Sequence, residues 1–243
     1  MKFDAVYYEP AIFDYPLGRQ LREEYRDLPW IPIESHNSIR EMQEKPNDQF
    51  GHMKRNLIAG IRKTHKYVEN HKVSDYLVPY TSSGCTAMCL YCYLVCNYNK
   101  CAYLRLFVNR EQMLDRIIKK GRESGNPLTF EIGSNSDLVL ENTITDNLLY
   151  TIPRFAVEGV GKITFPTKFH MVEPLLGLEH RGKVIFRMSV NPQNIISRVE
   201  LGTSSLKQRI QAVNQMCEAG YPCGLLIAPV ILMEGWREMY TGL

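Results

Sequence analysis

Short apolar runs alternate with amphipathic segments along the chain from Tyr76 onward. Five of the apolar runs have the length and composition of strands, and they cover residues 76–81, 128–133, 162–166, 184–190 and 224–232. Strands that alternate with helical segments are typical of βαβ units, which build a parallel sheet. The pattern therefore predicts an α/β fold for residues 76–243.

Two of the intervening segments have helical periodicity and recognisable ends. One helix is expected between Asn109, which forms a possible capping box with Gln112, and Gly121. Its apolar residues share one face: Met113, Leu114, Ile117 and Ile118. A second helix is expected between residues 203–205 and Gly220, with an apolar face made of Leu206, Ile210, Val213 and Cys217. Cys217 is therefore expected in the core.

Residues 1–75 lack this regularity, and we expect them to form an N-terminal lead-in to the sheet. Within the lead-in, residues 51–72 carry six Lys or Arg and three His against a single acidic residue, Glu69. A basic stretch of this kind can follow the phosphates of a nucleic acid, which makes it a candidate DNA-facing segment. It can equally form a solvated surface.

The composition is that of an ordinary globular protein, since 44% of the 243 residues are hydrophobic and 23% are charged. A chain of this length can bury a substantial core. No apolar run approaches the roughly 20 residues that cross a bilayer. The first residues also lack the continuous apolar core of a signal peptide. We therefore expect the protein in the cytoplasm.

Five of the seven cysteines lie between Cys85 and Cys101, which favours a metal or redox site over a disulfide framework. Cys85, Cys89 and Cys92 have the spacing C-x3-C-x2-C directly after the first expected strand. A structural zinc site usually has a fourth protein ligand, whereas a 4Fe–4S cluster held by three cysteines keeps one iron open for chemistry. A zinc knuckle or three reduced core cysteines are the alternatives.

This spacing, with Tyr91 just before the third cysteine, resembles the signature of the radical S-adenosylmethionine (SAM) enzymes. The resemblance implies that the open iron binds SAM and that an electron from the cluster releases a 5′-deoxyadenosyl radical. It also implies a partial TIM-like (β/α)6 barrel, whose chemistry lies at the carboxyl ends of the strands. The five expected strands are one fewer than the six of that barrel.

Outside the cysteine loop, a set of segments resembles the spore photoproduct lyase family in order along the chain: residues 8–10, 15–18, 35–37, 60–64, 167–170, 219–222 and 234–236. The resemblance implies a DNA repair lyase that cleaves spore photoproduct, 5-thyminyl-5,6-dihydrothymine, back to two thymines. Its partners would be duplex DNA that contains the lesion and an electron donor such as a flavodoxin or ferredoxin, in the cytoplasm of the spore core. A lesion inside a duplex must be extruded to be reached.

The same resemblance assigns roles to named residues. It implies that Cys85, Cys89 and Cys92 hold the cluster. It implies that Tyr91 and Tyr93 are catalytic and pass a hydrogen atom back to SAM. SAM itself would be bound by Ser136, Lys168, Ser189, Asn191 and the backbone of Ala228. The alternatives are aromatic packing for the tyrosines and loop capping for the serines and the asparagine.

One position departs from the family pattern. Many members have a cysteine in the loop after the second strand as the hydrogen-atom donor, and Ser134 stands there in this chain. The O–H bond of serine is too strong to give a hydrogen atom readily to a carbon radical. Our hypothesis is that Cys96, four residues past Cys92, replaces this donor, with Cys101 as a second candidate. A packing role for these two cysteines is the alternative.

A second departure concerns the end of the chain. Family members continue past residues 234–236 with further barrel elements and a β-hairpin that wedges against the lesion, and this part is absent from the sequence. The expected barrel is therefore partial, with an exposed edge. Three rival functions follow from these departures. They are a radical SAM enzyme with another substrate, an inactive nucleic-acid-binding homologue, and a zinc-binding structural module.

Overall fold

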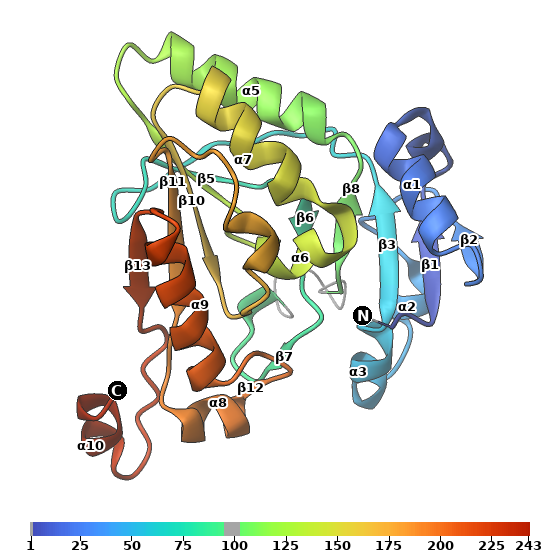
Figure 1. Cartoon of the computed structure of the whole chain (residues 1–243). Helices are drawn as coiled ribbons and strands as arrows, with labels where there is room; N and C mark the ends of the chain where they lie inside the picture. The colour runs from blue at the N-terminus through green and yellow to red at the C-terminus, as the bar shows by residue number, and fades with distance from the viewer. Residues whose placement is uncertain (1, 95–102) are drawn as a thin grey trace.

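Two β-sheets organise the structure, a computed structural model that describes residues 2–94 and 103–243 (Figure 1). The larger sheet has the strand order β13 (Cys223–Leu226), β11 (Val184–Ser189), β10 (Lys162–Thr167), β9 (Thr129–Ile132), β5 (Tyr76–Val78) and β4 (Val68–Glu69). Its neighbouring strands are parallel except for the β4–β5 pair. The five strands predicted from the sequence are confirmed, and the α/β class with them.

Two of these strands are shorter than the apolar pattern predicts. Strand β13 ends at Leu226, shortly before Pro229, whose missing N–H cannot extend a ladder of hydrogen bonds. Strand β5 ends at Val78, because the chain then turns into a strand of the smaller sheet, β6 (Ser82–Ser83). The turn thereby places the cysteine loop, which follows β6, at the boundary between the two sheets.

The smaller sheet has the order β2 (Trp30–Pro32), β1 (Ala5–Tyr8), β3 (Asn56–Gly60), β8 (Arg105–Phe107) and β6. All its pairs are parallel except β6–β8. Three strands from the first 60 residues thus share a sheet with two later strands, as the right-hand side of Figure 1 shows. The short helices of this part are η1 (Pro10–Asp14), α1 (Pro16–Glu24), α2 (Arg40–Gln43), η2 (Asn47–Gln49) and α3 (Phe50–Met53).

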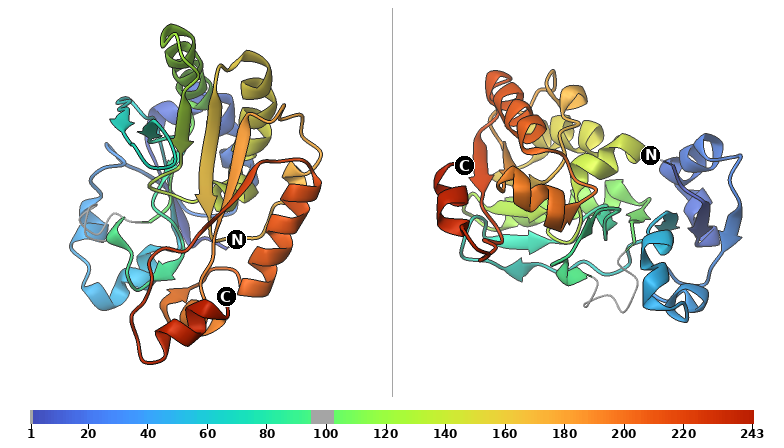
Figure 2. Two further views of the ribbon diagram at one scale, coloured as in Figure 1. Left: turned by 90° about the vertical axis from the view of Figure 1, so that its left-hand side faces the viewer. Right: turned by 90° about the horizontal axis from the view of Figure 1, so that it is seen from below.

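Helices alternate with the strands of the larger sheet. They are α5 (Arg110–Glu123) before β9, α6 (Leu138–Thr145) and α7 (Asn147–Glu158) before β10, η3 (Glu173–Leu175) before β11, and α8 (Gln193–Val199) and α9 (Leu206–Glu218) before β13; α10 (Trp236–Thr241) follows β13. Figure 2 shows α7 and α9 on the same side of the strands. A third, two-stranded sheet pairs β7 (Met88–Cys89) with β12 (Glu200–Leu201). Among the described helices, none has the length and apolar character needed to cross a membrane.

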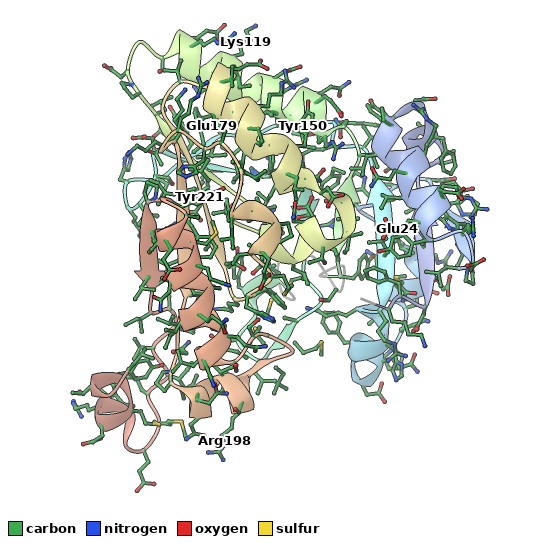
Figure 3. All side chains as sticks on the ribbon, in the orientation of Figure 1. Glu24, Lys119, Tyr150, Glu179, Arg198 and Tyr221 are labelled. Atoms are coloured by element: carbon green, nitrogen blue, oxygen red, sulfur yellow. The ribbon has the colours of Figure 1, made fainter. Side chains whose placement is uncertain are left out.

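The main core lies between the larger sheet and these helices. Phe130, Phe165 and Phe186 are fully buried on the three central strands β9, β10 and β11. Phe165 and Phe186 are partners in the parallel register, with ring centroids 6.1 Å apart. Tyr221, just past the end of α9 (Figure 3), closes one end of this core by donating its hydroxyl to the carbonyl of Leu175 at 2.8 Å.

Helix α5 begins after Asn109, as predicted, but differs at its end. Asn109 donates a hydrogen bond to the side chain of Gln112 at 3.0 Å. It makes no side-chain cap bond to the helix backbone, because its amide also pairs with the backbone of Arg62 through two hydrogen bonds of 3.0 Å. The helix also continues through Gly121 to Glu123. A Cβ atom at Gly121 would lie 2.8 Å from the carbonyl oxygen of Val160, so this glycine permits close packing rather than ending the helix.

Helix α9 starts as predicted but buries a different face. A capping box forms between Ser205 and Gln208. The buried residues of the helix are Arg209, Ala212 and Met216. Cys217 is exposed, so its expected place in the core is wrong. The helix is turned so that the guanidinium of Arg209 reaches a buried carboxylate, Glu200, at 2.7 Å.

Glu9, directly after β1, ties three segments of the smaller sheet together. Its Oε1 accepts hydrogen bonds from the backbone N–H of His36 at 3.0 Å and from Nδ1 of His36 at 2.7 Å. Its Oε2 accepts a hydrogen bond from the backbone N–H of Ile61 at 3.0 Å. Burial alone would raise the pKa of this carboxyl, but the hydrogen bonds from His36 and Ile61 lower it to about 2.

A pH-dependent stability follows from this carboxylate. Because the pKa of Glu9 is lower in the folded chain than its ordinary value, Glu9 stabilises the fold above about pH 4.5, and the effect is lost as the pH falls towards 2. We expect Glu9→Gln to cost about 3 kcal/mol near pH 6 and much less near pH 2, measured by urea denaturation. The control is Glu34→Gln, at an exposed carboxylate nearby. A cost for Glu9→Gln that is independent of pH would contradict this role.

Candidate active site

The three cysteines of the C-x3-C-x2-C loop are held by backbone contacts to both halves of the chain. Gly84, which has a positive φ of 76°, turns the chain from β6 into Cys85 and donates its N–H to the carbonyl of Asn135 at 2.9 Å. Cys89 lies in β7 and is the register partner of Glu200 in β12. The N–H of Cys92 donates to the carbonyl of Cys89 at 3.1 Å, which closes the loop.

All three cysteines line one cavity of about 260 Å³ at the carboxyl ends of the parallel strands. The cavity is also lined by most of the other residues that the sequence singled out: Tyr91, Tyr93, Ser134, Ser136, Lys168, Ser189 and Ala228. These residues come from loops far apart in the sequence. They meet because the carboxyl ends of neighbouring parallel strands lie at one edge of the sheet.

Lys168 is the positive charge of this cavity. Its Nζ donates hydrogen bonds to the hydroxyl of Ser189 and, at 3.5 Å, to the carbonyl of Ala228. It also lies 3.2 Å from a carboxylate oxygen of Glu200 and 5.8 Å from the ring centroid of Tyr91. One ammonium thus links three strand ends to the cysteine loop.

Glu200 is an acidic centre that the sequence did not reveal. It is fully buried and lies 2.7 Å from the guanidinium of Arg209, which is also fully buried. Burial would raise the pKa of Glu200, but the charges of Lys168 and Arg209 and the hydrogen bond from Tyr91 lower it. Asn191 does not line the cavity. Its amide instead donates to Glu200 at 2.8 Å, so it lies behind this carboxylate.

Asp137 is a second cavity residue missed from the sequence. It begins α6, and its carboxylate accepts hydrogen bonds from the backbone N–H of Leu140 at 3.2 Å and of Lys168 at 2.9 Å. The hydroxyl of Thr167 adds a third at 2.8 Å. The sequence indicates this cap, since an Asp stands directly before an apolar helical run. The sequence does not indicate the contact between Asp137 and Lys168, which follows β10.

The two tyrosines of the loop have different surroundings. The hydroxyl of Tyr91 donates to Glu200, and burial together with this bond raises the pKa of Tyr91. Tyr93 is 56% exposed, and its hydroxyl donates to the backbone carbonyl of Ser134 at 2.9 Å. Tyr93 therefore contacts the backbone of the loop that contains Ser134. The donor candidates Cys96 and Cys101 lie outside the described residues.

Burial disfavours the thiolate forms of Cys85 and Cys89. Burial raises the pKa of the Cys85 thiol to about 12 and also raises the pKa of Cys89. A bound metal reverses this effect, because a coordinating thiol loses its proton. The N–H of Ala87 donates to Sγ of Cys85 at 3.4 Å, a type of hydrogen bond that tunes iron–sulfur clusters.

Within residues 2–94 and 103–243, no three His, Cys, Asp or Glu side chains lie close enough to hold a single metal ion. The sulfurs of a 4Fe–4S cluster's three cysteines bind different irons and therefore surround one space. Cys85, Cys89 and Cys92 line one cavity, and they are the residues that could hold such a group.

Known proteins resemble this chain along its whole length. The sequence model of the spore photoproduct lyase family matches residues 1–243. The spore photoproduct lyase of Bacillus subtilis (strain 168) is 37% identical over 243 residues, which cover 98% of this chain and 70% of that protein. The spore photoproduct lyase of Geobacillus sp. (strain Y412MC61) is 33% identical over 240 residues, which cover 97% and 70%.

Solved structures agree with the sequence matches. A spore photoproduct lyase complexed with dinucleoside spore photoproduct has a TM-score of 0.92 and 31% identity, over 99% of this chain and 72% of that one. A doubly substituted spore photoproduct lyase with bound AdoMet and dinucleoside spore photoproduct has the same TM-score, identity and coverage. With the family match over all 243 residues, these similarities establish that the chain belongs to the spore photoproduct lyase family.

Proposed function

We propose that the chain is a DNA repair lyase that converts spore photoproduct in duplex DNA back into two thymines, using a 4Fe–4S cluster and SAM. The observation that carries this proposal is the meeting of Cys85, Cys89 and Cys92 with Lys168 and Ser189 in one cavity. When bound, the cluster and SAM supply a 5′-deoxyadenosyl radical, which takes a hydrogen atom from the lesion and starts its cleavage.

The residues around Lys168 would hold SAM. The ammonium of Lys168 can pair with the carboxylate of SAM, and Glu200 and Ser189 fix its position. Ser136 offers a hydroxyl from the neighbouring loop, where it already accepts a hydrogen bond from Ser82 at 2.9 Å. Asn191 would not contact SAM directly but would orient Glu200 through its hydrogen bond to that carboxylate. Support for the cofactor comes from the similar spore photoproduct lyase with bound AdoMet.

The lesion would enter the same cavity from the side of the tyrosines. Tyr93, which is more than half exposed, can contact an extruded dinucleotide, whereas Tyr91 is turned towards Glu200 and Lys168. These positions suit the relay of a hydrogen atom between substrate and SAM. The reaction also needs a one-electron donor such as a flavodoxin or ferredoxin, and we place it in the cytoplasm of the spore core. Residues 51–72 would contribute to DNA binding.

Anaerobic reconstitution with iron and sulfide tests the proposal. The reduced protein is given SAM and a spore-photoproduct dinucleotide, and the products are separated by chromatography. Thymine products with little net loss of SAM are the expected result. Deoxyadenosine without repair would instead favour a radical SAM enzyme with another substrate. DNA binding without either product would favour an inactive nucleic-acid-binding homologue, and a colourless protein that contains zinc would favour a structural module.

The hydrogen-atom donor can be tested in the same assay. We propose that Cys96 supplies the hydrogen atom that Ser134 cannot give, and we expect Cys96→Ala to replace clean thymine products by radical adducts. Ser134→Cys in that background should restore clean products, because Ser134 lines the cavity beside Tyr93. The matched control is Cys223→Ala, at a thiol that packs near α9. If Cys96→Ala alone still gave clean thymine products, Cys96 would not be the hydrogen-atom donor.

A further inference from the structure

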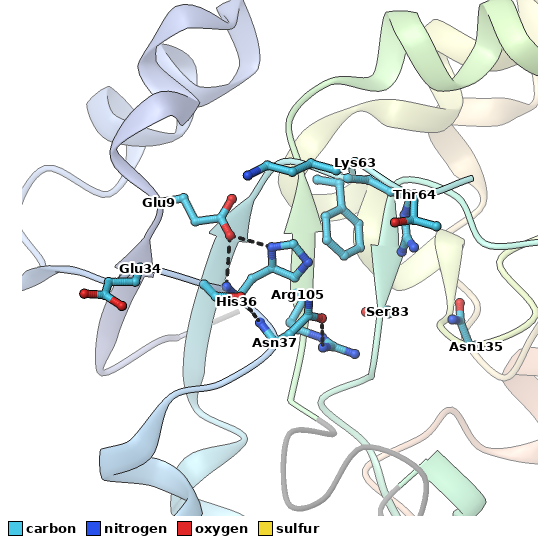
Figure 4. Close-up of a pocket in the computed structure, with 12 residues that line it drawn as sticks. Glu9, Glu34, His36, Asn37, Lys63, Thr64, Ser83, Arg105 and Asn135 are labelled. Carbon is cyan, nitrogen blue, oxygen red and sulfur yellow. Dashed lines mark hydrogen bonds and ion pairs between the residues drawn. The ribbon is translucent and has the colours of Figure 1, made fainter. Parts of the chain in front are cut away.

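A second cavity, of about 390 Å³, is lined by none of the residues proposed above for the cluster, SAM or the hydrogen relay (Figure 4). Arg62 and Lys63, which line it, belong to the basic stretch 51–72. It opens between the end of β3, the loop around His36 and the strands β6 and β8. The residues that matter for its chemistry are Glu9, His36, Arg62, Lys63, Ser83 and Arg105. Its volume falls within the range typical of sites for small ligands.

A wall one strand thick separates this cavity from the cysteine site. Ser83 lines the second cavity and Cys85 the first, because the left-handed turn at Gly84 sends the two side chains to opposite sides. In the facing loop, Asn135 lines the second cavity while Ser134 lines the first. Gly84 bridges to Ser136 and bonds to Asn135, so the two segments are locked together.

The charges of the second cavity favour an anion. Arg62, Lys63 and Arg105 line it, and Arg105 is only 3% exposed. Both carboxylate oxygens of Glu9 are already engaged by His36 and Ile61. The other acidic residue, Glu34, is exposed, and Figure 4 shows its carboxylate turned away from the other labelled side chains. The cavity is therefore lined by three basic side chains, while its buried carboxylate is already held by His36 and Ile61.

The hydroxyl of Ser83 points to a ligand independently of these charges. Ser83 is only 2% exposed, and within the described part of the chain its Oγ has no hydrogen-bond partner. Buried hydroxyls are nearly always hydrogen-bonded, because an unsatisfied one costs free energy. Ser83 lines the cavity beside two guanidinium groups, where an anionic oxygen would satisfy it.

We propose that this cavity binds a phosphate group of the DNA strand next to the lesion, an inference that rests on the proposed function. A phosphate offers several acceptor oxygens at once, which suits a cavity lined by guanidinium groups, an ammonium and a hydroxyl. If the damaged bases lie in the cysteine cavity, the strand would continue over Ser83 and Asn135, and a neighbouring phosphate would lie in the second cavity. The cavity thereby sets which dinucleotide of the strand faces the cysteines.

Ligands with and without phosphate test this proposal on the reconstituted protein with SAM and no reductant. The probes are a spore-photoproduct dinucleotide with 5′- and 3′-terminal phosphates, the dinucleoside without phosphate, and an undamaged thymidine dinucleotide with terminal phosphates. We expect the phosphates to strengthen binding to the wild type about tenfold or more. Ser83→Ala and Lys63→Glu should each remove most of that gain and leave the affinity for the dinucleoside unchanged.

Lys119→Glu is the matched control, because Lys119 is an exposed lysine on α5, away from both cavities, and should keep the full phosphate gain. An unchanged gain in both Ser83→Ala and Lys63→Glu would overturn the proposal. Inorganic phosphate that binds as tightly as the phosphorylated dinucleotide would also overturn it, because the cavity would then be a site for a free ion. If no variant binds the dinucleoside but the undamaged phosphorylated probe still depends on Lys63 and Ser83, the cavity assignment stands and the proposed repair function fails.

Discussion

Cys89→Ser should abolish iron binding at the cysteine loop and reduce repair to background. Cys89 is the central cysteine of the loop and a proposed ligand of the cluster, and β7 pairs it with Glu200 in β12. Serine has nearly the same volume as cysteine but is a poor ligand for iron in a cluster, so the fold should survive while the site is lost. Iron and sulfide content after reconstitution, together with the yield of thymine products, measures the effect.

Cys217→Ser is the control for this substitution, because Cys217 is exposed on α9 and does not line the cavity. The control should keep full iron content and full activity. Normal iron content in Cys89→Ser would remove Cys89 from the ligand set. A protein that loses its fold together with bound zinc would instead support the structural module, since structural zinc contributes folding free energy directly.

The larger sheet could be predicted from the sequence because its central strands β9, β10 and β11 are buried on both faces. Such strands form continuous apolar runs. The helices between them have recognisable ends, as Ser205 before α9 and Gly220 after it show. Lys168 and Ser189 could be expected near one another for the same reason, since each follows or ends a strand of one parallel sheet. Their roles in binding SAM stay predictions.

The smaller sheet could not be predicted in the same way. Strands β6 and β8 have two and three residues, too few to show a period, and their pairing joins segments far apart in the chain. The buried pair of Glu200 and Arg209 was missed for a related reason. A charged residue in an apolar segment looks like a solvated position unless its partner is known, and here the partner is on a different element.

Glu200→Gln should destabilise the protein by about 3 kcal/mol or more, because it leaves a fully buried guanidinium without its carboxylate. Glu200 lies 2.7 Å from Arg209 and 3.2 Å from Lys168, and it accepts a hydrogen bond from Asn191 at 2.8 Å. Glutamine keeps the shape of the side chain but removes its charge. The free energy of unfolding from urea denaturation measures the loss.

Glu158→Gln provides the matched control, because Glu158 pairs with Arg154 at 2.9 Å on the surface of α7, where water screens the ion pair. The double substitution Glu200→Gln with Arg209→Met should recover much of the lost stability, since it removes the uncompensated buried charge as well. A cost for Glu200→Gln no larger than that of the control would mean that Arg209 finds another partner. Recovery in the double variant without recovery of repair would separate the two roles of Glu200, because Lys168 and Tyr91 would still lack the carboxylate that holds them at the cavity.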